Sequence, residues 1–244
     1  MRSPQIKVQL DPAAVAGEAA ERFIALADES IRDSGRFSVA LAGGSTPKAM
    51  YELLAGEPYR ARVDWAKVHV YFGDERTVPP DHAESNYRMA REALLWKVPI
   101  PDDNVHRMRG ELPDPNEAAK EYGQMLKQTF GDAGGLDLVL LGMGDDGHTA
   151  SLFPGTVALN ETHHRSVANF VPKLNTWRIT LSAPFINRAR HVLVLVTGHA
   201  KASRVAEVIE GAPDPQRLPI QLIRPEQGTM TWLLDAGAAG MTEG

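Results

Sequence analysis

The residue best suited to chemistry in this chain is His148, which stands with two aspartates in a glycine-rich turn directly after an apolar stretch. The stretch at 136–141 predicts a buried strand, because it is short, nearly continuously apolar and interrupted by Gly142 and Gly144. Glycines at the carboxyl end of such a strand let a ligand approach the backbone closely. Histidine suits proton transfer there, because the ordinary pKa of an imidazole is ~6.5. The turn therefore predicts acid–base chemistry.

A second glycine turn, LAGGSTP at 41–47, has the composition of an anion site. A predicted strand at 37–42 and a predicted helix at 48–55 flank it, so backbone amides and the positive helix end converge there. The segment is neither a Walker A loop nor a GxGxxG fingerprint, and by itself it equally fits an ordinary capped turn. Its candidate residues are Gly43, Gly44, Ser45 and Thr46, with Ser45 or Thr46 expected to cap the helix and Pro47 expected at its first position.

Three consecutive charged residues, Asp74, Glu75 and Arg76, follow a third predicted strand at 68–72. Such a run usually forms a solvated loop. Its place at a strand end favours a ligand-binding site instead, because the guanidinium group of an arginine can bind a carboxylate or phosphate through two hydrogen bonds. We expect one or two of these side chains to face a ligand and the others to form structural ion pairs.

Basic residues recur near predicted element ends in the last third of the chain, at Lys173, Arg178 and Lys201. A lysine on a helix is most often only solvated. The turn before Lys201, however, joins a predicted strand at 191–197 to a predicted helix at 200–211, which makes it a second candidate anion contact.

Composition excludes several classes of function. The formal net charge of −5 argues against nucleic acid as the main partner. The absence of cysteine excludes disulfides, thiolate nucleophiles and cysteine-bound zinc. The other histidines lack metal-ligand spacing such as HExxH, so no metal is expected. No apolar run reaches the ~20 residues of a membrane span and no signal core is present, so we expect a cytoplasmic protein that does not engage a membrane.

Strand and helix signals alternate along the chain without a linker or an internal repeat. Further helices are predicted at 12–33, 86–97 and 116–130, and further strands at 6–10, 166–171, 177–181 and 231–234. The spacing favours a single α/β domain over 1–244, with an ordered core at about 5–236 and a mostly parallel, twisted sheet covered by helices on both faces.

Three motifs together, LAGGSTP, FGDERTVPPDHAESNY and GMGDDGHTASLFP, resemble the 6-phosphogluconolactonase family, and the likeness runs over almost the whole chain. The resemblance implies a Rossmann-like fold of the NagB/RpiA-like type and the hydrolysis of 6-phospho-D-glucono-1,5-lactone without a cofactor. It implies a sugar-phosphate lactone as the small-molecule partner, and we expect a monomer or weak homo-oligomer. It also assigns phosphate binding to Gly44, Ser45 and Thr46, with Arg178 and Lys201 as charged partners.

Lactone hydrolysis needs a general base, stabilisation of an oxyanion and a proton for the leaving ring oxygen. We expect His148 to be the base and then the acid, Asp146 to hold its imidazole, and backbone amides of the glycine turn to face the oxyanion. The partner of Arg76 is left open: it is the phosphate, the lactone carbonyl or the neighbouring acidic residues. The role of Asp74 is also left open: it is either proton transfer or the orientation of sugar hydroxyls.

Two other functions compete with hydrolysis. Glucosamine-6-phosphate deaminase/isomerase shares the fold and the sugar-phosphate site, but deaminases typically read DEY and DGHIAFNEP at the second and third motifs. Phe153 stands here where their glutamate assists ring opening, and phenylalanine cannot move a proton. A non-enzymatic sugar-phosphate-sensing module would need a DNA-binding segment, for which the chain has no additional helix-turn-helix region or basic arm.

Overall fold

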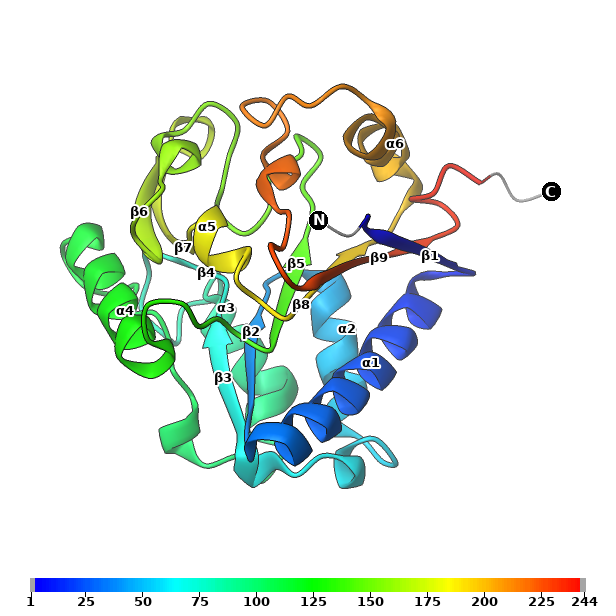
Figure 1. Cartoon of the computed structure of the whole chain (residues 1–244), viewed down its shortest axis with the longest axis vertical. Helices are drawn as coiled ribbons and strands as arrows, with labels where there is room; N and C mark the ends of the chain where they lie inside the picture. Colours follow the sequence, from blue (N-terminus) through cyan, green and yellow to red (C-terminus); the bar gives the residue numbers. More distant parts are fainter. Residues whose placement is uncertain (1–2, 242–244) are drawn as a thin grey trace.

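The computed structural model describes residues 3–241 and contains two sheets (Figure 1). A six-stranded sheet has the order β1-β9-β8-β5-β2-β3, and all its neighbouring strands are parallel. A three-stranded antiparallel sheet has the order β4-β7-β6. The strands are β1 (Gln5–Gln9), β2 (Phe37–Leu41), β3 (Val68–Phe72), β4 (Asp74–Arg76), β5 (Leu138–Gly142), β6 (Ser166–Val171), β7 (Thr176–Leu181), β8 (His191–Val196) and β9 (Thr229–Asp235).

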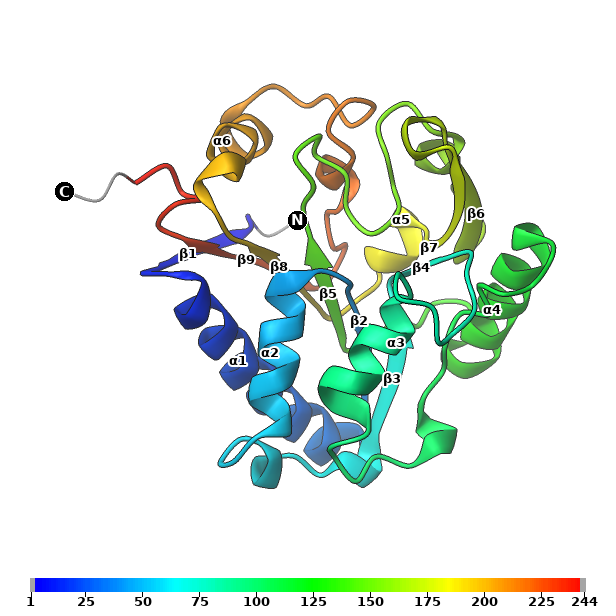
Figure 2. The ribbon, with the colours of Figure 1, turned by 180° about the vertical axis from the view of Figure 1, so that it is seen from behind.

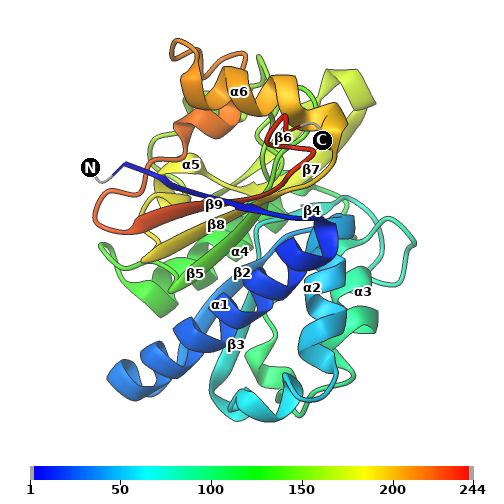
Figure 3. The same ribbon diagram turned by 90° about the vertical axis from the view of Figure 1, so that its right-hand side faces the viewer.

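Helices cover the large sheet on both sides. Figure 3 shows α1, α2 and α3 on one side of the sheet and α6 on the other, and Figure 2 shows α1 to α3 from behind. The α-helices are α1 (Pro12–Ser34), α2 (Ser45–Ala55), α3 (Asn86–Ala90), α4 (Pro115–Phe130), α5 (Ala183–Ile186) and α6 (Ala202–Glu210). A π-helical turn (Arg91–Leu95) follows α3, and short 3-10 helices lie at Arg60–Arg62, Trp65–Lys67, Asp102–Asn104, Val157–Asn160, Pro172–Leu174, His199–Lys201 and Pro219–Leu222.

Local sequence explains why these elements begin and end where they do. Helix α1 starts at Pro12 because the Asp11 carboxylate accepts the Ala14 amide at 2.8 Å, and it ends at Gly35, whose φ of 76° suits the left-handed cap. Strand β2 is apolar except for Ser38 and buried along its whole length, since sheet neighbours flank it on both sides.

The chain reverses direction across the sheet between β2 and β5. From β2 it moves outward to β3, and it then returns to place β5 on the opposite side of β2. In open α/β sheets, ligands bind at the carboxyl ends of the strands that flank such a switch point. The topology therefore places the segments after β2, β5 and β8 around one crevice.

The predicted fold class, an α/β protein with a mostly parallel sheet between helices, is confirmed. The predicted ordered core, 5–236, lies within the described residues, whereas residues 1, 2 and 242–244 of the predicted domain lie outside them. One expectation was wrong in detail: residues 74–76 form strand β4 of the small sheet rather than a loop. The strands predicted at 166–171 and 177–181 are β6 and β7 of this sheet, whereas β4 was not predicted, because a three-residue strand is too short to show periodicity.

Two helix predictions also need correction. Neither Ser45 nor Thr46 caps α2, because the helix already begins at Ser45 and Gly44 is its N-cap, with a φ of 105° that favours glycine. The hydroxyls lie within the first turn. The predicted helix at 86–97 is divided, since α3 passes at Arg91 into the π-helical turn.

Candidate active site

Two adjoining cavities of about 340 and 320 Å³ open at the switch point. Each is in the range of small-molecule sites, ~300–1,000 Å³. They share a wall and so form one cleft, which we call the switch-point cleft. The residues that line both cavities are Asp74, Arg76, Gly144, His148, Ala150 and Lys201.

The first cavity holds the turn after β2. Gly43, Gly44, Ser45 and Thr46 line it together with Lys201 and Thr197 from the segment after β8. The Tyr51 hydroxyl fixes the end of β2, because it donates to the Ala42 carbonyl at 2.9 Å and accepts the Ala42 amide at 3.0 Å. The Thr46 and Thr197 hydroxyls hydrogen-bond to each other at 2.8 Å, which joins the start of α2 to the end of β8.

The turn after β5 holds His148 against Asp146. The imidazole Nδ1 lies 2.5 Å from Asp146 Oδ1, and no hydrogen bond among the described residues involves Nε2. Gly144 makes room for the ring, since a Cβ there would fall 2.1 Å from both Nδ1 and Cε1. The arrangement leaves Nε2 as the nitrogen that can exchange a proton with a bound molecule.

Asp146 is ionised by its surroundings. Partial burial acts to raise the pKa of this carboxyl, but hydrogen bonds from Lys173 and His148 outweigh burial and hold the pKa well below its usual range. Lys173 Nζ lies 2.9 Å from Asp146 Oδ2, so both carboxylate oxygens are engaged. Asp146 can therefore orient the imidazole and stabilise an imidazolium, while it does not itself carry a proton at neutral pH.

The amides of Gly144 and Gly147 form hydrogen bonds within the turn. The Gly144 amide donates to the His148 carbonyl at 2.9 Å, and the Gly147 amide donates to the Gly144 carbonyl at 3.0 Å. The expectation that amides of the turn stabilise an oxyanion is thus wrong for these two groups, because the turn uses them to close itself. Positive side chains of the cleft remain for that purpose.

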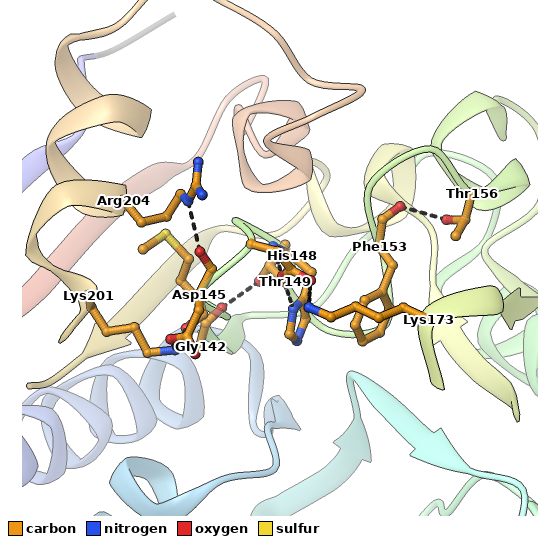
Figure 4. A network of polar contacts seen from close by, with 11 residues as sticks. Gly142, Asp145, His148, Thr149, Phe153, Thr156, Lys173, Lys201 and Arg204 are labelled. Atoms are coloured by element: carbon orange, nitrogen blue, oxygen red, sulfur yellow. Dashed lines mark hydrogen bonds and ion pairs between the residues drawn. The ribbon is translucent and has the colours of Figure 1, made fainter. Parts of the chain in front are cut away.

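Lys201 is held by the same turn. Its Nζ donates to the Met143 carbonyl at 3.1 Å and lies 2.5 Å from Asp145 Oδ1 (Figure 4). The hydrogen bond and charge of Lys201 lower the pKa of the Asp145 carboxyl. Consecutive aspartates thus pair with lysines from opposite sides of the cleft, Asp145 with Lys201 after β8 and Asp146 with Lys173 between β6 and β7.

The three charged side chains of β4 point alternately to the two faces of the small sheet. Successive side chains of a strand point to opposite faces, and Asp74 and Arg76 accordingly line the cleft while Glu75 points away. The Glu75 carboxylate accepts four hydrogen bonds, from the Arg76, Asn86 and Tyr87 amides and the Ser85 hydroxyl. Burial raises the pKa of Glu75. Its role is to hold the start of α3, and it forms no ion pair with a described residue.

Asp74 is buried and fixed at both oxygens. Ser151 Oγ donates to Oδ2 at 2.6 Å, and Asn86 Nδ2 donates to Oδ1 at 3.1 Å. The Asn86 amide also packs against Gly43, where a Cβ would fall 2.1 Å from Asn86 Oδ1. Sequence reasoning did not single out Ser151 or Asn86, although both lie inside the quoted motifs.

Arg178 lines only the second cavity, with Lys173 and Phe153, whereas the glycine turn 43–46 lines only the first. The structure therefore places all ten candidate residues on the walls of these two cavities, but it divides the expected phosphate ligands between them. Arg76 and Lys201 connect them. Burial and the nearby charge of Arg76 lower the pKa of Arg178.

Three other cavities within residues 3–241, of about 340, 350 and 390 Å³, contain none of the candidate residues. The cavity of about 340 Å³ lies between α6 and β9 and is lined mostly by apolar side chains. Residues 3–241 contain no group of three or more His, Asp or Glu side chains placed to hold a metal ion. Within the same residues, no helix is both long and apolar enough to cross a membrane.

A charged cleft at the switch point of a parallel sheet is the place where open α/β proteins bind small molecules, which is the class that this fold and site define. The chain belongs to the family described as glucosamine-6-phosphate isomerases/6-phosphogluconolactonase, whose model matches residues 10–232. It is 42% identical over 238 residues to the 6-phosphogluconolactonase of a Nostoc species, with 96% of each chain covered. It is 41% identical to the 6-phosphogluconolactonase of a Synechocystis species, with 97% of each chain covered.

Solved structures agree with this family. A 6-phosphogluconolactonase from Trypanosoma cruzi superposes with a TM-score of 0.86 at 35% identity, covering 97% of this chain and 96% of the other. A monomeric glucosamine-6-phosphate deaminase superposes with a TM-score of 0.80 over 98% of this chain and all of its own, at 20% identity. The second likeness shows the shared fold.

Proposed function

We propose that this protein is a 6-phosphogluconolactonase, which hydrolyses 6-phospho-D-glucono-1,5-lactone to 6-phospho-D-gluconate in the second step of the oxidative pentose phosphate pathway. Relatives named for this activity match almost the whole chain at 42% and 41% identity. The observation that carries the choice within the family is the phenyl ring of Phe153, which packs on His148 where the deaminase pattern has a glutamate. An aromatic ring favours hydrolysis over deamination, because it cannot transfer a proton.

The reaction proceeds through His148. Nε2 accepts a proton from water as the water oxygen attacks the lactone carbonyl carbon, and Asp146 stabilises the resulting imidazolium through Nδ1. When the tetrahedral intermediate collapses, the bond between this carbon and the ring oxygen breaks and the imidazolium protonates that oxygen. The product is a carboxylic acid with a free hydroxyl, and the acid releases a proton to water to become the carboxylate. Water and protein side chains suffice, so no cofactor takes part.

We assign the phosphate to the junction of the two cavities. Lys201 lines both, and the first turn of the 11-residue helix α2, at Ser45 and Thr46, offers backbone amides and the positive helix end. Arg178 approaches from the second cavity. This placement lets the residues of both cavities act on one substrate, with the lactone carbonyl towards His148.

Two roles follow for the residues of β4. Arg76 lines both cavities beside His148, so its guanidinium is the group we assign to the developing oxyanion. Asp74 has one oxygen bound by Ser151 and the other by Asn86, which suits the orientation of sugar hydroxyls better than proton transfer.

A direct assay tests the function. Glucose 6-phosphate and its dehydrogenase supply the lactone, and the rate of lactone disappearance is compared with and without this protein. Glucosamine 6-phosphate with ammonia release is the control reaction. Acceleration of the first reaction alone supports the proposal, whereas activity in the second alone assigns the protein to the deaminases.

A cytoplasmic location and a monomeric or weakly associating state are also proposed, on the composition of the chain. Light scattering of the purified protein tests the second. A stable oligomer at micromolar concentration would contradict it.

A further inference from the structure

The ring of Phe153 lies almost parallel to the imidazole of His148. The two ring centroids are 4.0 Å apart and the planes differ by 18°. Parallel aromatic contacts of this kind stabilise one relative orientation of two rings beyond the effect of burial. Figure 4 shows the Phe153 and His148 side chains next to each other, with Lys173 beside them.

A single hydrogen bond does not fix the direction of Nε2. The contact between Nδ1 and Asp146 Oδ1, at 2.5 Å, restrains one atom of the ring, and a hydrogen bond tolerates small rotations of the ring about its Cβ–Cγ bond. Such a rotation moves Nε2, the nitrogen assigned to proton transfer, while the hydrogen bond persists. A flat ring against the face of the imidazole opposes that rotation. The hydrogen bond therefore restrains the position of Nδ1, and the aromatic contact restrains the rotation of the ring.

Phe153 is itself held in place. Its side chain is buried, and its carbonyl accepts the Thr156 hydroxyl at 2.7 Å. Asn169 of β6 is fully buried and donates to the same hydroxyl at 3.0 Å and to the Ser151 carbonyl at 2.8 Å. The small sheet thus anchors the loop at both sides of Phe153, so the phenyl ring is a fixed surface rather than a mobile neighbour.

The backbone of this loop is constrained as well. Ala150 has a φ of 46°, in the left-handed region that disfavours residues with a Cβ, and the Leu152 amide donates to the Thr149 carbonyl at 2.9 Å. Backbone strain of this kind persists only where surrounding contacts determine the conformation. The turn from His148 to Phe153 is therefore tightly specified.

We propose that Phe153 is a positioning residue, which keeps the His148 imidazole in the orientation from which Nε2 exchanges the proton. Its catalytic consequence rests on the proposed lactonase function, whereas the aromatic contact itself does not. The residue acts through His148 and need not touch the substrate.

The first test measures the contact without using activity. His148 ring protons are followed by NMR in protein labelled at histidine, with assignment by His148→Gln. Loss of the phenyl ring current in Phe153→Leu is expected to move these resonances downfield, and Phe153→Tyr is expected to leave them nearly in place. Phe170→Leu is the matched control, because Phe170 contacts Trp177 instead of His148. Unchanged His148 resonances in Phe153→Leu would overturn the proposal.

The second test measures turnover of the phosphorylated lactone. Phe153→Leu is expected to lower kcat roughly 2- to 10-fold, the equivalent of one aromatic contact, with little change in KM. Phe153→Tyr should restore most of kcat, and Phe170→Leu should match the parent protein. Equal kcat in Phe153→Leu and the parent, or equal losses in the Leu and Tyr variants, would refute a positioning role.

Two further controls separate the possible failures. If Phe153→Leu does not fold, Phe153→Met is measured in the same way, since its flexible side chain fills the space without a ring. If the parent protein does not hydrolyse the lactone, the proposed function fails, while the NMR test still decides whether Phe153 contacts the His148 ring.

Discussion

Arg76 and Arg178 lie directly opposite each other on the antiparallel strands β4 and β7. Like charges at directly opposed positions of a sheet destabilise it, and here burial and the charge of Arg76 both lower the pKa of Arg178. Both side chains line the second cavity. Such a pair is explained by an anion that binds between or beside the guanidinium groups, as the phosphate or oxyanion of the proposed substrate would.

Removal of one arginine is therefore expected to stabilise the fold. Arg178→Met should raise the free energy of unfolding by about 0.2–1 kcal/mol, because it ends the repulsion without loss of a hydrogen bond to a described residue. Arg76→Met is the comparison, since Arg76 Nη1 also donates to the Glu84 carbonyl at 2.5 Å and this contact is lost. Urea denaturation measures both. A less stable Arg178→Met protein would show that the repulsion is already neutralised.

The phosphate assignment predicts a selective loss. Lys201→Met and Arg178→Met should each lower kcat/KM for the phosphorylated lactone roughly 10- to 100-fold, the usual range for a hydrogen bond to a charged group. Unphosphorylated gluconolactone should be affected much less. Lys120→Met, which changes an exposed lysine on α4, is the control. Similar losses on the two lactones would remove these residues from the phosphate site.

Proton transfer by His148 predicts a loss in turnover rather than in binding. His148→Gln should lower kcat by about 100-fold or more, while KM changes little. The measurement is the coupled assay with the phosphorylated lactone. Turnover near that of the parent protein would assign the base elsewhere in the cleft.

Removal of the Asp145 carboxylate is expected to increase the affinity of the cleft for anions. Its carboxylate lies 2.5 Å from Lys201 Nζ and must compete there with a phosphate group. Asp145→Asn should therefore tighten the binding of inorganic phosphate roughly 1.5- to 5-fold, the equivalent of one exposed ion pair. Calorimetry gives the dissociation constant, and Asp64→Asn, which breaks the exposed pair with Lys67, is the control. Weaker binding to Asp145→Asn would show that the carboxylate orders Lys201 instead of competing for it.

Asp146 is expected to contribute to the free energy of unfolding in a way that depends on pH. Its pKa is lower in the folded protein than in the unfolded chain, so ionised Asp146 stabilises the fold above the ordinary carboxyl pKa of ~3.9. This contribution is lost as the pH falls from that value through the lower pKa of the folded state. Asp146→Asn should therefore be less stable than the parent at pH 7, and the two unfolding curves should converge in acid. A constant difference would contradict the assigned ionisation.

The sequence by itself determined the fold class and most elements of the large sheet. The runs predicted as strands at 37–42 and 136–141 contain β2 and most of β5, because burial on both faces favours nearly continuous apolar residues. The sequence also located His148 and the glycine turn before α2, since glycine and proline have strong local preferences.

Only the tertiary structure decided which residues act together. Arg76 and Arg178 are 102 positions apart and meet through strand pairing. Asp145 and Asp146 are neighbours in sequence, yet they pair with lysines on opposite sides of the cleft. Phe153 could be identified from its motif, but its place on the face of His148 depends on a loop anchored to β6. These relationships arise from packing between distant segments, which local pattern does not encode.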